Sequence, residues 1–313
     1  MEHATDWEIF FDENPKPIQF EEKILQIKDF CQKLVKENKP IVLVTSSGTT
    51  VPLEQNTVRF IDNFSAGTRG AASAEYFLDA GYCVIFLYRT KTLEPFTRNL
   101  SGENLLDMFE ITEDGNSKTI KVKECENEKL FKLISNYHKF KQQIVKISFI
   151  TLSDYLWLLR AVAQELSTFG PKALLYLAAA VSDFYIPITQ MPNHKIQSSN
   201  GPLSLSLQLV PKMLGPLVTL WAPKAFIVSF KLETNEEILE SKARQALSKY
   251  KHNVVIGNLL QNRKFHVILV DASSTSQQHI VLSQEEVKTG MEIESKIIDS
   301  IQDYHKKYCE ENV

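Results

Sequence analysis

Short apolar runs and stretches with helical spacing alternate along most of this chain. The apolar runs are rich in β-branched and aromatic residues, and the clearest lie at 41–44, 84–88, 145–149, 173–177, 225–230 and 254–258. Such runs are typical of strands that are buried on both faces of a parallel sheet. Between them, small and apolar residues recur at helical spacing, which predicts helices at 20–38, 71–78, 155–166, 238–249 and 292–308.

The order of these elements predicts the fold class. Strands that alternate with helices indicate an α/β fold, here a single doubly wound, Rossmann-like domain with a mostly parallel sheet. Residues 267–270 and 279–282 look like a short antiparallel pair at its edge. Residues 1–20 contain Pro15 and Pro17 and are interpreted as an irregular N-terminal arm. The domain itself is then expected to cover residues 21–313.

Residues 89–143 interrupt this pattern and are predicted to be a surface insertion. They contain a polar stretch at 113–117 and many lysines between 118 and 141. Because acids such as Glu124 and Glu126 are interleaved with these lysines, a solvated helix is favoured over a basic binding patch.

Composition narrows the classes of function. The chain has 313 residues and a formal net charge of −3, so its charge does not argue for binding to nucleic acid or to an anionic membrane. No apolar run has the length of a membrane span, and the acidic N-terminus does not resemble a transit peptide. The four cysteines are far apart, with neither disulfide nor metal-ligand spacing. We therefore expect a cytoplasmic protein without a metal site of its own.

The stretch between the first strand and the helix that follows it contains many residues that could bind a ligand. It runs from Thr45 to Gly67, whereas loops in compact α/β units usually have about 2–6 residues. Its small hydroxyl residues and glycines let backbone N–H groups approach an anion, and the next helix points its positive end to the same place. The loop also carries Arg59, Asp62 and Asn63. A phosphate site is one interpretation, and an ordinary glycine-rich turn is the other.

A second cluster follows the strand at 173–177. The alanines at 178–180 lie at the carboxyl end of this strand, which is where open α/β sheets bind their ligands. Without other context, close packing of a helix explains these alanines more simply, and a solvent-facing turn explains Asp183 equally well. Further along, Lys195 lies in a polar loop, where an exposed lysine without a special function is the default interpretation.

Several nucleotide-dependent functions stay open on these residues alone. No GxGxxG motif follows the first strand, and the strand at 84–88 is followed by Arg89 rather than by an acidic residue. An NAD oxidoreductase is therefore weakly supported, and an NADP enzyme that uses Arg89 lacks its glycines. The absence of a GxxxxGK[ST] motif excludes a P-loop. A non-catalytic nucleotide-binding module would leave Asn63, Asp183 and Lys195 without a role.

Five motifs follow one another in a specific order along the chain. They are VTSSGT with VPLE at 44–54, VRFIDNFSAG at 58–67, LAAAVSDFY at 177–185, MPNHKIQSS at 191–199 and SFKLET at 229–234. Together they resemble the motifs of phosphopantothenoylcysteine synthetase (phosphopantothenate–cysteine ligase) in its stand-alone eukaryotic form. The resemblance covers the chain from about residue 20 onward.

The resemblance implies a ligase of coenzyme A biosynthesis that joins 4′-phosphopantothenate to cysteine. ATP, or alternatively CTP, would activate the carboxylate as an acyl-nucleotidyl intermediate with loss of pyrophosphate, and Mg²⁺ would accompany the triphosphate. The cysteine amine would then form 4′-phosphopantothenoylcysteine and release the nucleoside monophosphate. This chemistry needs no nucleophile from the protein, but it requires anionic groups to be positioned and developing charge to be neutralised.

The resemblance also assigns roles to single residues. It places in the nucleotide site Ser47, Ser65, Gly67, Gly70, Phe230 and Asn258. It places in the phosphopantothenate site Asn63, Ala179, Ala180 and Asp183. Arg59 matches an arginine that the other subunit of a homodimer contributes, and Lys195 matches the lysine of a mobile loop that closes over the nucleotide. Asn63, Lys195 and Arg59 are the expected catalytic residues. Ser47 departs from the family pattern, which commonly has glycine at this position.

Overall fold

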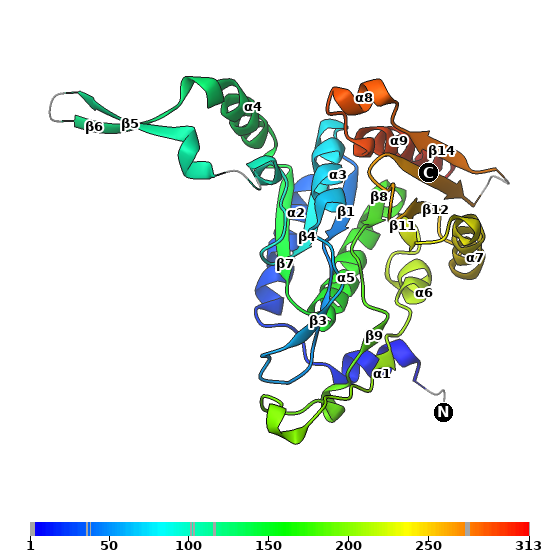
Figure 1. Cartoon of the computed structure of the whole chain (residues 1–313). Coiled ribbons are helices and arrows are strands. Elements are labelled where there is room, and N and C mark those ends of the chain that lie inside the picture. The colour runs from blue at the N-terminus through cyan, green and yellow to red at the C-terminus, as the bar shows by residue number, and fades with distance from the viewer. Residues whose placement is uncertain are drawn as a thin grey trace.

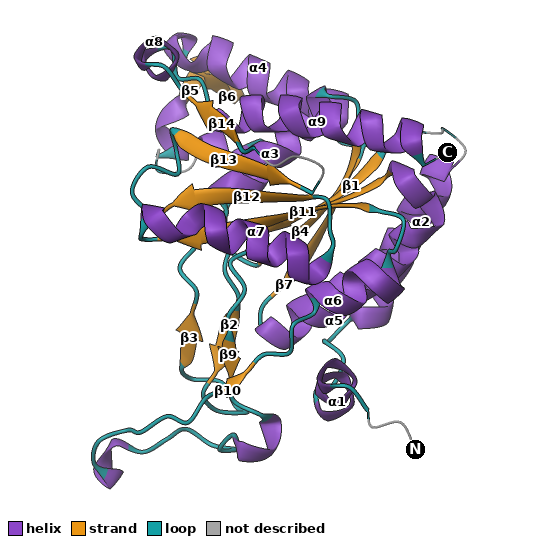
Figure 2. Ribbon diagram, turned by 90° about the vertical axis from the view of Figure 1, so that its right-hand side faces the viewer, coloured by secondary structure: helices purple, strands orange, loops and turns teal. Residues whose placement is uncertain are grey.

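Eight strands form one sheet through the centre of the molecule in the computed structural model, which describes residues 4–35, 37, 39–100, 102, 104–114, 117–272 and 276–312 (Figures 1 and 2). In spatial order they are β14 (Gln278–Val281), β13 (His266–Asp271), β12 (Val254–Leu259), β11 (Phe226–Glu233), β8 (Ala173–Leu177), β1 (Ile41–Ser46), β4 (Cys83–Arg89) and β7 (Ile144–Phe149). The strands from β12 to β7 are parallel, whereas β13 and β14 pair antiparallel. The predicted α/β class with an antiparallel edge is confirmed.

Helices cover both faces of this sheet (Figure 2). On one face lie α2 (Phe20–Val35) and α5 (Leu152–Leu166), and on the other lie α3 (Thr68–Asp79) and α9 (Ile293–Glu311). The remaining helices are α1 (Asp6–Glu13), α4 (Glu124–Phe140), α6 (Leu214–Pro216), α7 (Leu239–Tyr250) and α8 (Gln284–Lys288). None of the helices in the described ranges combines the length and the apolar character needed to cross a bilayer.

Strand β1 shows why its sequence is an unbroken apolar run. Ile41 and Leu43 enter the apolar core that contains residues of α2 and α5. Val42 and Val44 enter the second core, between the sheet and helices α3 and α9. All four side chains are buried, because a central parallel strand has no solvent-facing side.

The long connection from Thr45 to Gly67 is not one continuous loop, which corrects the prediction from its sequence. It contains a small antiparallel hairpin of β2 (Thr50–Pro52) and β3 (Phe60–Asp62). A second short ladder, β9 (Phe184–Tyr185) with β10 (Gln208–Leu209), lies beside it on the same side of the molecule (Figure 2). The hairpin accounts for the unusual length of this connection.

The prediction of an irregular segment over residues 1–20 was wrong for much of the part that the structure describes. Thr5 and Glu8 form a capping box that starts α1, with the Thr5 N–H donating to the Glu8 carboxylate at 2.8 Å. Phe10 and Phe11 are buried, and Phe11 packs edge-on against Trp157 of α5 at 4.7 Å between ring centroids. The helix is therefore held by tertiary burial of its aromatic residues. The division of the chain into an arm and a domain stays a prediction.

The predicted surface insertion at 89–143 is only partly on the surface. Its hairpin of β5 (Phe109–Asp114) and β6 (Ser117–Val122) projects from the body (Figure 1), and residues 115 and 116 of its polar turn lie outside the described residues. In contrast, Phe140 at the end of α4 is buried.

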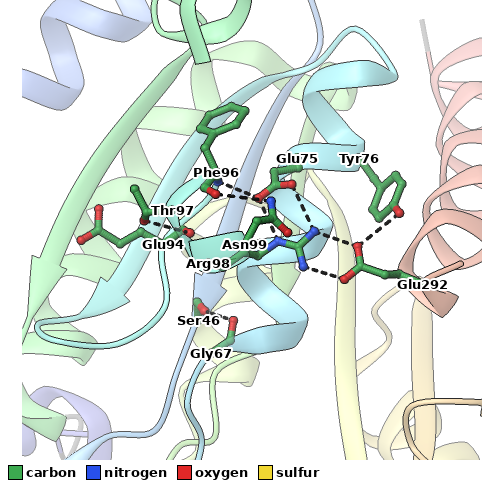
Figure 3. Close-up of polar contacts among 10 residues, drawn as sticks. All are labelled: Ser46, Gly67, Glu75, Tyr76, Glu94, Phe96, Thr97, Arg98, Asn99 and Glu292. Atoms are coloured by element: carbon green, nitrogen blue, oxygen red, sulfur yellow. Dashed lines mark hydrogen bonds and ion pairs between the residues drawn. The ribbon is translucent and has the colours of Figure 1, made fainter. Parts of the chain in front are cut away.

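The beginning of the insertion is anchored by Arg98, whose guanidinium lies between two carboxylates (Figure 3). It binds Glu75 of α3 through Nε at 2.8 Å and Glu292, just before α9, through Nη2 at 2.7 Å. Since Arg98 is largely buried, its ion pairs with these carboxylates compensate the loss of hydration of its charge. The loop after β4 is thus attached to the helices that cover this face of the sheet.

Candidate active site

The ends of β1 and β8 form the floor of the candidate site. The Ala180 N–H donates to the Ser47 carbonyl at 2.8 Å, and the Thr49 N–H donates to the Ala180 carbonyl at 3.1 Å. The Ala179 N–H donates to the Thr45 hydroxyl at 3.1 Å. Because the two strands are parallel, these half-buried alanines lie at the carboxyl edge of the sheet, as predicted.

Ser47 has a backbone conformation that usually selects glycine. Its φ angle is +75°, in the left-handed region that costs an L-residue roughly 1–2 kcal/mol. Its hydroxyl lies 2.6 Å from the hydroxyl of Thr92, in the loop after β4. Glycine would adopt this conformation without strain, and the Ser47 side chain is engaged in a hydrogen bond within the protein.

Gly48 allows the segment that carries Asn63 to lie directly against the end of β1. A side chain at Gly48 would place its Cβ atom 1.6 Å from the Asn63 carbonyl oxygen. The Gly48 N–H donates to the Ser65 carbonyl at 3.3 Å, and the Asn63 N–H donates to the Thr49 carbonyl at 3.2 Å. Asn63 and Ser65 are therefore joined through these hydrogen bonds to the same sheet edge as Ala180.

The turn into α3 uses two further glycines for different reasons. Gly67 is the N-cap residue with a φ angle of +88°, and a Cβ there would lie 2.7 Å from the Ser47 hydroxyl. A Cβ at Gly70 would lie 2.5 Å from the Cβ of Ser46, so Gly70 lets α3 approach β1. The first N–H groups of a helix have no intrahelical partner and favour an anion. Here those of α3 begin beside Ser47.

Phe230 and Asn258 lie on the two strands beyond β8. The register pairs Phe230 with Ile256 and Leu232 with Asn258, which places Phe230 and Asn258 on the same face of the sheet. The Phe230 ring packs edge-on against Tyr176 at 5.0 Å between centroids. The Ser73 hydroxyl on α3 donates to the Tyr176 hydroxyl at 3.0 Å, so this face is the one that α3 covers. The structure thus brings both residues to the side of the turn at Gly67.

Asp183 forms an ion pair that the sequence did not predict. Its Oδ1 lies 2.6 Å from Nζ of Lys212, and both side chains are more than half exposed. The Ser182 N–H, next to it, donates to the Thr49 hydroxyl at 3.0 Å. Asp183 is therefore close to the sheet edge and exposed to solvent, with a cation beside it.

Arg59 and Lys195 belong to a second group, away from the sheet edge. The Arg59 guanidinium donates to Oε1 of Glu54 at 2.9 Å and to the Ile196 carbonyl at 3.2 Å, adjacent to the exposed Lys195. Within the described ranges, no hydrogen bond or ion pair joins the side chain of Arg59 or Lys195 to Asn63 or Ala180. The predicted residues therefore form two separate groups in one chain.

Comparison with known proteins decides the family. Residues 131–304 match the family model described as DNA/pantothenate metabolism flavoprotein C-terminal domain. The phosphopantothenate–cysteine ligase of Homo sapiens is 45% identical over 283 residues, which are 89% of this chain and 90% of that protein. This chain belongs to the phosphopantothenate–cysteine ligase family. The family member CAB2 of Saccharomyces cerevisiae is 44% identical over 329 residues, covering 98% of this chain and 87% of that protein.

A solved structure of a family member agrees with this fold. It is a histidine-to-alanine mutant of Cab2 in complex with phosphopantothenate-cysteine, with a TM-score of 0.87 and 43% identity. The match covers 97% of this chain and 99% of that one. The resemblance inferred from the five motifs is confirmed, while the roles of single residues in this ligase-family chain stay predictions.

The structure does not support the alternative that this ligase-family member is an oxidoreductase. Arg89, which an NADP enzyme would use for a phosphate, is ion-paired with Asp62 of β3. The same pair attaches the β2–β3 hairpin to the end of β4. An ordinary structural role thus accounts for Arg89.

Several residues that build this site were not among the predicted site residues. Gly48 and the hydroxyls of Thr45 and Thr49 hold the strand ends together, and their signal was the run of small hydroxyl residues around a glycine. Lys212 had no such signal, because its partner Asp183 lies 29 residues earlier in the chain. Glu54 lies only five residues from its ion-pair partner Arg59, but the hydrogen bond that it accepts from the Ile196 N–H is formed only in the fold.

Proposed function

We propose that this protein is a ligase that joins 4′-phosphopantothenate to cysteine in coenzyme A biosynthesis. The observation that carries the proposal is the 45% identity with the human phosphopantothenate–cysteine ligase over nine-tenths of both chains. The assembly of Asn63, Ala179, Ala180 and the Gly67 turn at one sheet edge supports it. We further propose an acyl-nucleotidyl intermediate, with 4′-phosphopantothenoylcysteine, a nucleoside monophosphate and pyrophosphate as products.

The predicted residues suit two steps of this reaction, namely binding of the nucleotide and stabilisation of the charge that develops on the acyl oxygen and on phosphate. The N–H groups at the start of α3 suit a nucleotide phosphate, with Phe230 and Asn258 on the same side of the sheet for the nucleoside. The Asn63 carboxamide can donate a hydrogen bond to the acyl oxygen without adding charge. Lys195 is exposed on a loop, where an ammonium can neutralise charge that builds on phosphate during transfer.

The nucleotide is ATP in this proposal, with CTP as the alternative. Magnesium supplies charge neutralisation on the triphosphate and enters with it. Mg²⁺ that is bound mainly through phosphate oxygens and water needs no dedicated set of protein ligands.

A homodimer completes the proposed site. Large apolar side chains are exposed on and beside the two short ladders β2–β3 and β9–β10, namely Val58, Phe60, Phe64, Phe184, Leu207 and Leu209. Such a concentration marks a surface that another protein covers. A second copy that binds there by two-fold symmetry would bring Arg59, which lies in the same hairpin, next to the other subunit.

The decisive experiment is a stoichiometric assay with phosphopantothenate, cysteine, Mg²⁺ and either ATP or CTP. We expect one nucleoside monophosphate and one pyrophosphate for each phosphopantothenoylcysteine formed. ADP with orthophosphate would instead indicate an acyl-phosphate mechanism and overturn the nucleotidyl intermediate. The relative kcat/KM values with ATP and CTP decide the nucleotide, and a protein without ligase activity with either would refute the proposed function.

A further inference from the structure

Glu54 is a buried carboxylate at the tip of the β2–β3 hairpin, and the assignments above give it no role. Its side chain is 0% exposed. It accepts hydrogen bonds from the Arg59 N–H at 2.9 Å, the Arg59 guanidinium at 2.9 Å and the Val58 N–H at 3.2 Å. It also accepts a longer one from the Ile196 N–H at 3.4 Å. The hydrogen bonds from Arg59 hold the pKa of the Glu54 carboxyl below its ordinary value, so the group is ionised at neutral pH.

The contacts of Glu54 reach across more than a hundred residues of sequence. Ile196 directly follows Lys195, and its N–H and carbonyl are bound by Glu54 and Arg59, respectively. One carboxylate and one guanidinium therefore hold both sides of the same peptide segment. Buried charges of this kind are retained only where they are paired and hydrogen-bonded, as they are here.

The neighbouring hairpin residues extend this attachment. The Gln55 N–H donates to the Pro192 carbonyl at 2.9 Å, and the Asn56 N–H donates to the Asn193 carbonyl at 3.1 Å. The Asn56 carboxamide donates to the same Asn193 carbonyl at 2.9 Å. The segment at 192–196 thus lies along the hairpin tip. Its backbone is hydrogen-bonded to the hairpin both before Lys195, at Pro192 and Asn193, and after it, at Ile196.

We propose that Glu54 is a positioning residue that fastens the Lys195 segment (residues 188–197) to the hairpin tip and thereby sets where the Lys195 ammonium can reach. This inference rests on the proposed function for its catalytic consequence, but the attachment itself can be measured without turnover. Release of the segment would require the hydrogen bonds of Glu54, Gln55, Asn56 and Arg59 to break together.

The test compares variants of the hairpin tip in the full-length protein. Glu54→Gln keeps the size of the side chain but removes the charge that holds Arg59 and turns one acceptor into a donor. Thr57→Ala is the matched control, because the Thr57 hydroxyl donates to the Glu54 carbonyl within the hairpin, at 3.2 Å, rather than to the Lys195 segment. Asn56→Ala, at an exposed position, is the milder variant if Glu54→Gln does not fold.

Hydrogen exchange measured by mass spectrometry is the first readout. Peptides that cover 53–59 and 188–197 should exchange at least about tenfold faster in Glu54→Gln than in wild type, while the core strands keep their rates. The Asn56→Ala variant should show the same effect to a smaller degree, and Thr57→Ala should match wild type. Unchanged exchange at 188–197 in both Glu54→Gln and Asn56→Ala would overturn the proposed attachment.

Kinetics form the second readout. Glu54→Gln should lower kcat for the ligase reaction by roughly 10–100-fold, because misplacement of a reacting group by about 1 Å has effects of this size. In a Lys195→Gln background the same substitution should cost at least about threefold less, since there is no ammonium left to position. An equal loss in both backgrounds would show that Glu54 does not act through Lys195. An inactive wild type would refute the ligase assignment and leave the exchange result standing.

Discussion

The approach of α3 to β1 can be tested by giving Gly70 a side chain. In Gly70→Ala the new Cβ would lie 2.5 Å from the Ser46 Cβ and 3.0 Å from the Ser46 Cα. Carbon atoms normally approach to about 3.5–4.0 Å, so α3 would have to withdraw by roughly 1 Å. Overpacking of this kind costs about 1–3 kcal/mol. Because one of these contacts is with the Ser46 backbone, the upper half of this range applies, about 2–3 kcal/mol. The better helix propensity of alanine returns up to about 1 kcal/mol, which leaves a net loss of roughly 1–2 kcal/mol.

Gly215 in α6 provides the control, since a Cβ there would meet no atom within 4 Å other than those of its chain neighbours and its φ angle is not positive. Because the Pro216 ring opposes a Cβ on the residue before it in a helix, the gain from a less flexible unfolded chain is offset, and Gly215→Ala should leave the free energy of unfolding within about 0.5 kcal/mol of wild type. Urea unfolding followed by tryptophan fluorescence measures both variants, and their free energies of unfolding should differ by roughly 1–2 kcal/mol. Gly70→Ala should also raise KM for the nucleotide, because the N–H groups of α3 move. If Gly70→Ala is as stable as Gly215→Ala, the inferred close contact is wrong.

Two further predictions concern pH and the subunit interface. Burial lowers the pKa of His252 and of His305 to about 4, from an ordinary 6.5. Between these values the unfolded chain binds more protons than the folded one, so stability falls as the pH falls, by about 1.3 kcal/mol per group between about pH 7.5 and 5.5. Urea unfolding at the two pH values measures the loss, His252→Gln should roughly halve it, and a pH-independent stability would contradict this reasoning. For the interface, Arg59→Ala and Asn63→Ala mixed in equal amounts and refolded together should restore up to about a quarter of wild-type activity, because half of the dimers are mixed and each has one site with both Asn63 and the Arg59 of the other subunit. Activity that stays at the level of the single variants would place Arg59 in the site of its own chain, and a fully active Arg59→Ala would leave it only its structural contacts with Glu54 and the Ile196 carbonyl.

The order and type of the main elements could be predicted from the sequence because each depends on burial within a short segment. The run at Ile41–Val44 is apolar at every position, since both faces of β1 are covered. Such a run predicts a buried strand without any knowledge of the residues that pack against it. The motifs around Asn63, Ala179 and Lys195 were sufficient to identify the family. Their order is a property of the sequence, so it can be recognised without knowing how the segments pack in the fold.

The contacts between distant segments could not be predicted in the same way. Helix α1 forms because Phe10 and Phe11 pack among aromatic residues of other helices, and the prolines that follow gave no sign of this. Gly70 is required by Ser46, and Glu54 binds the backbone of Ile196, a partner 142 residues away. Hydrophobic periodicity indicates whether a residue is buried, but it does not indicate which residues it packs against. Local patterns therefore predict the sheet, the helices and the family, whereas close approaches and long-range hydrogen bonds become visible only in the folded chain.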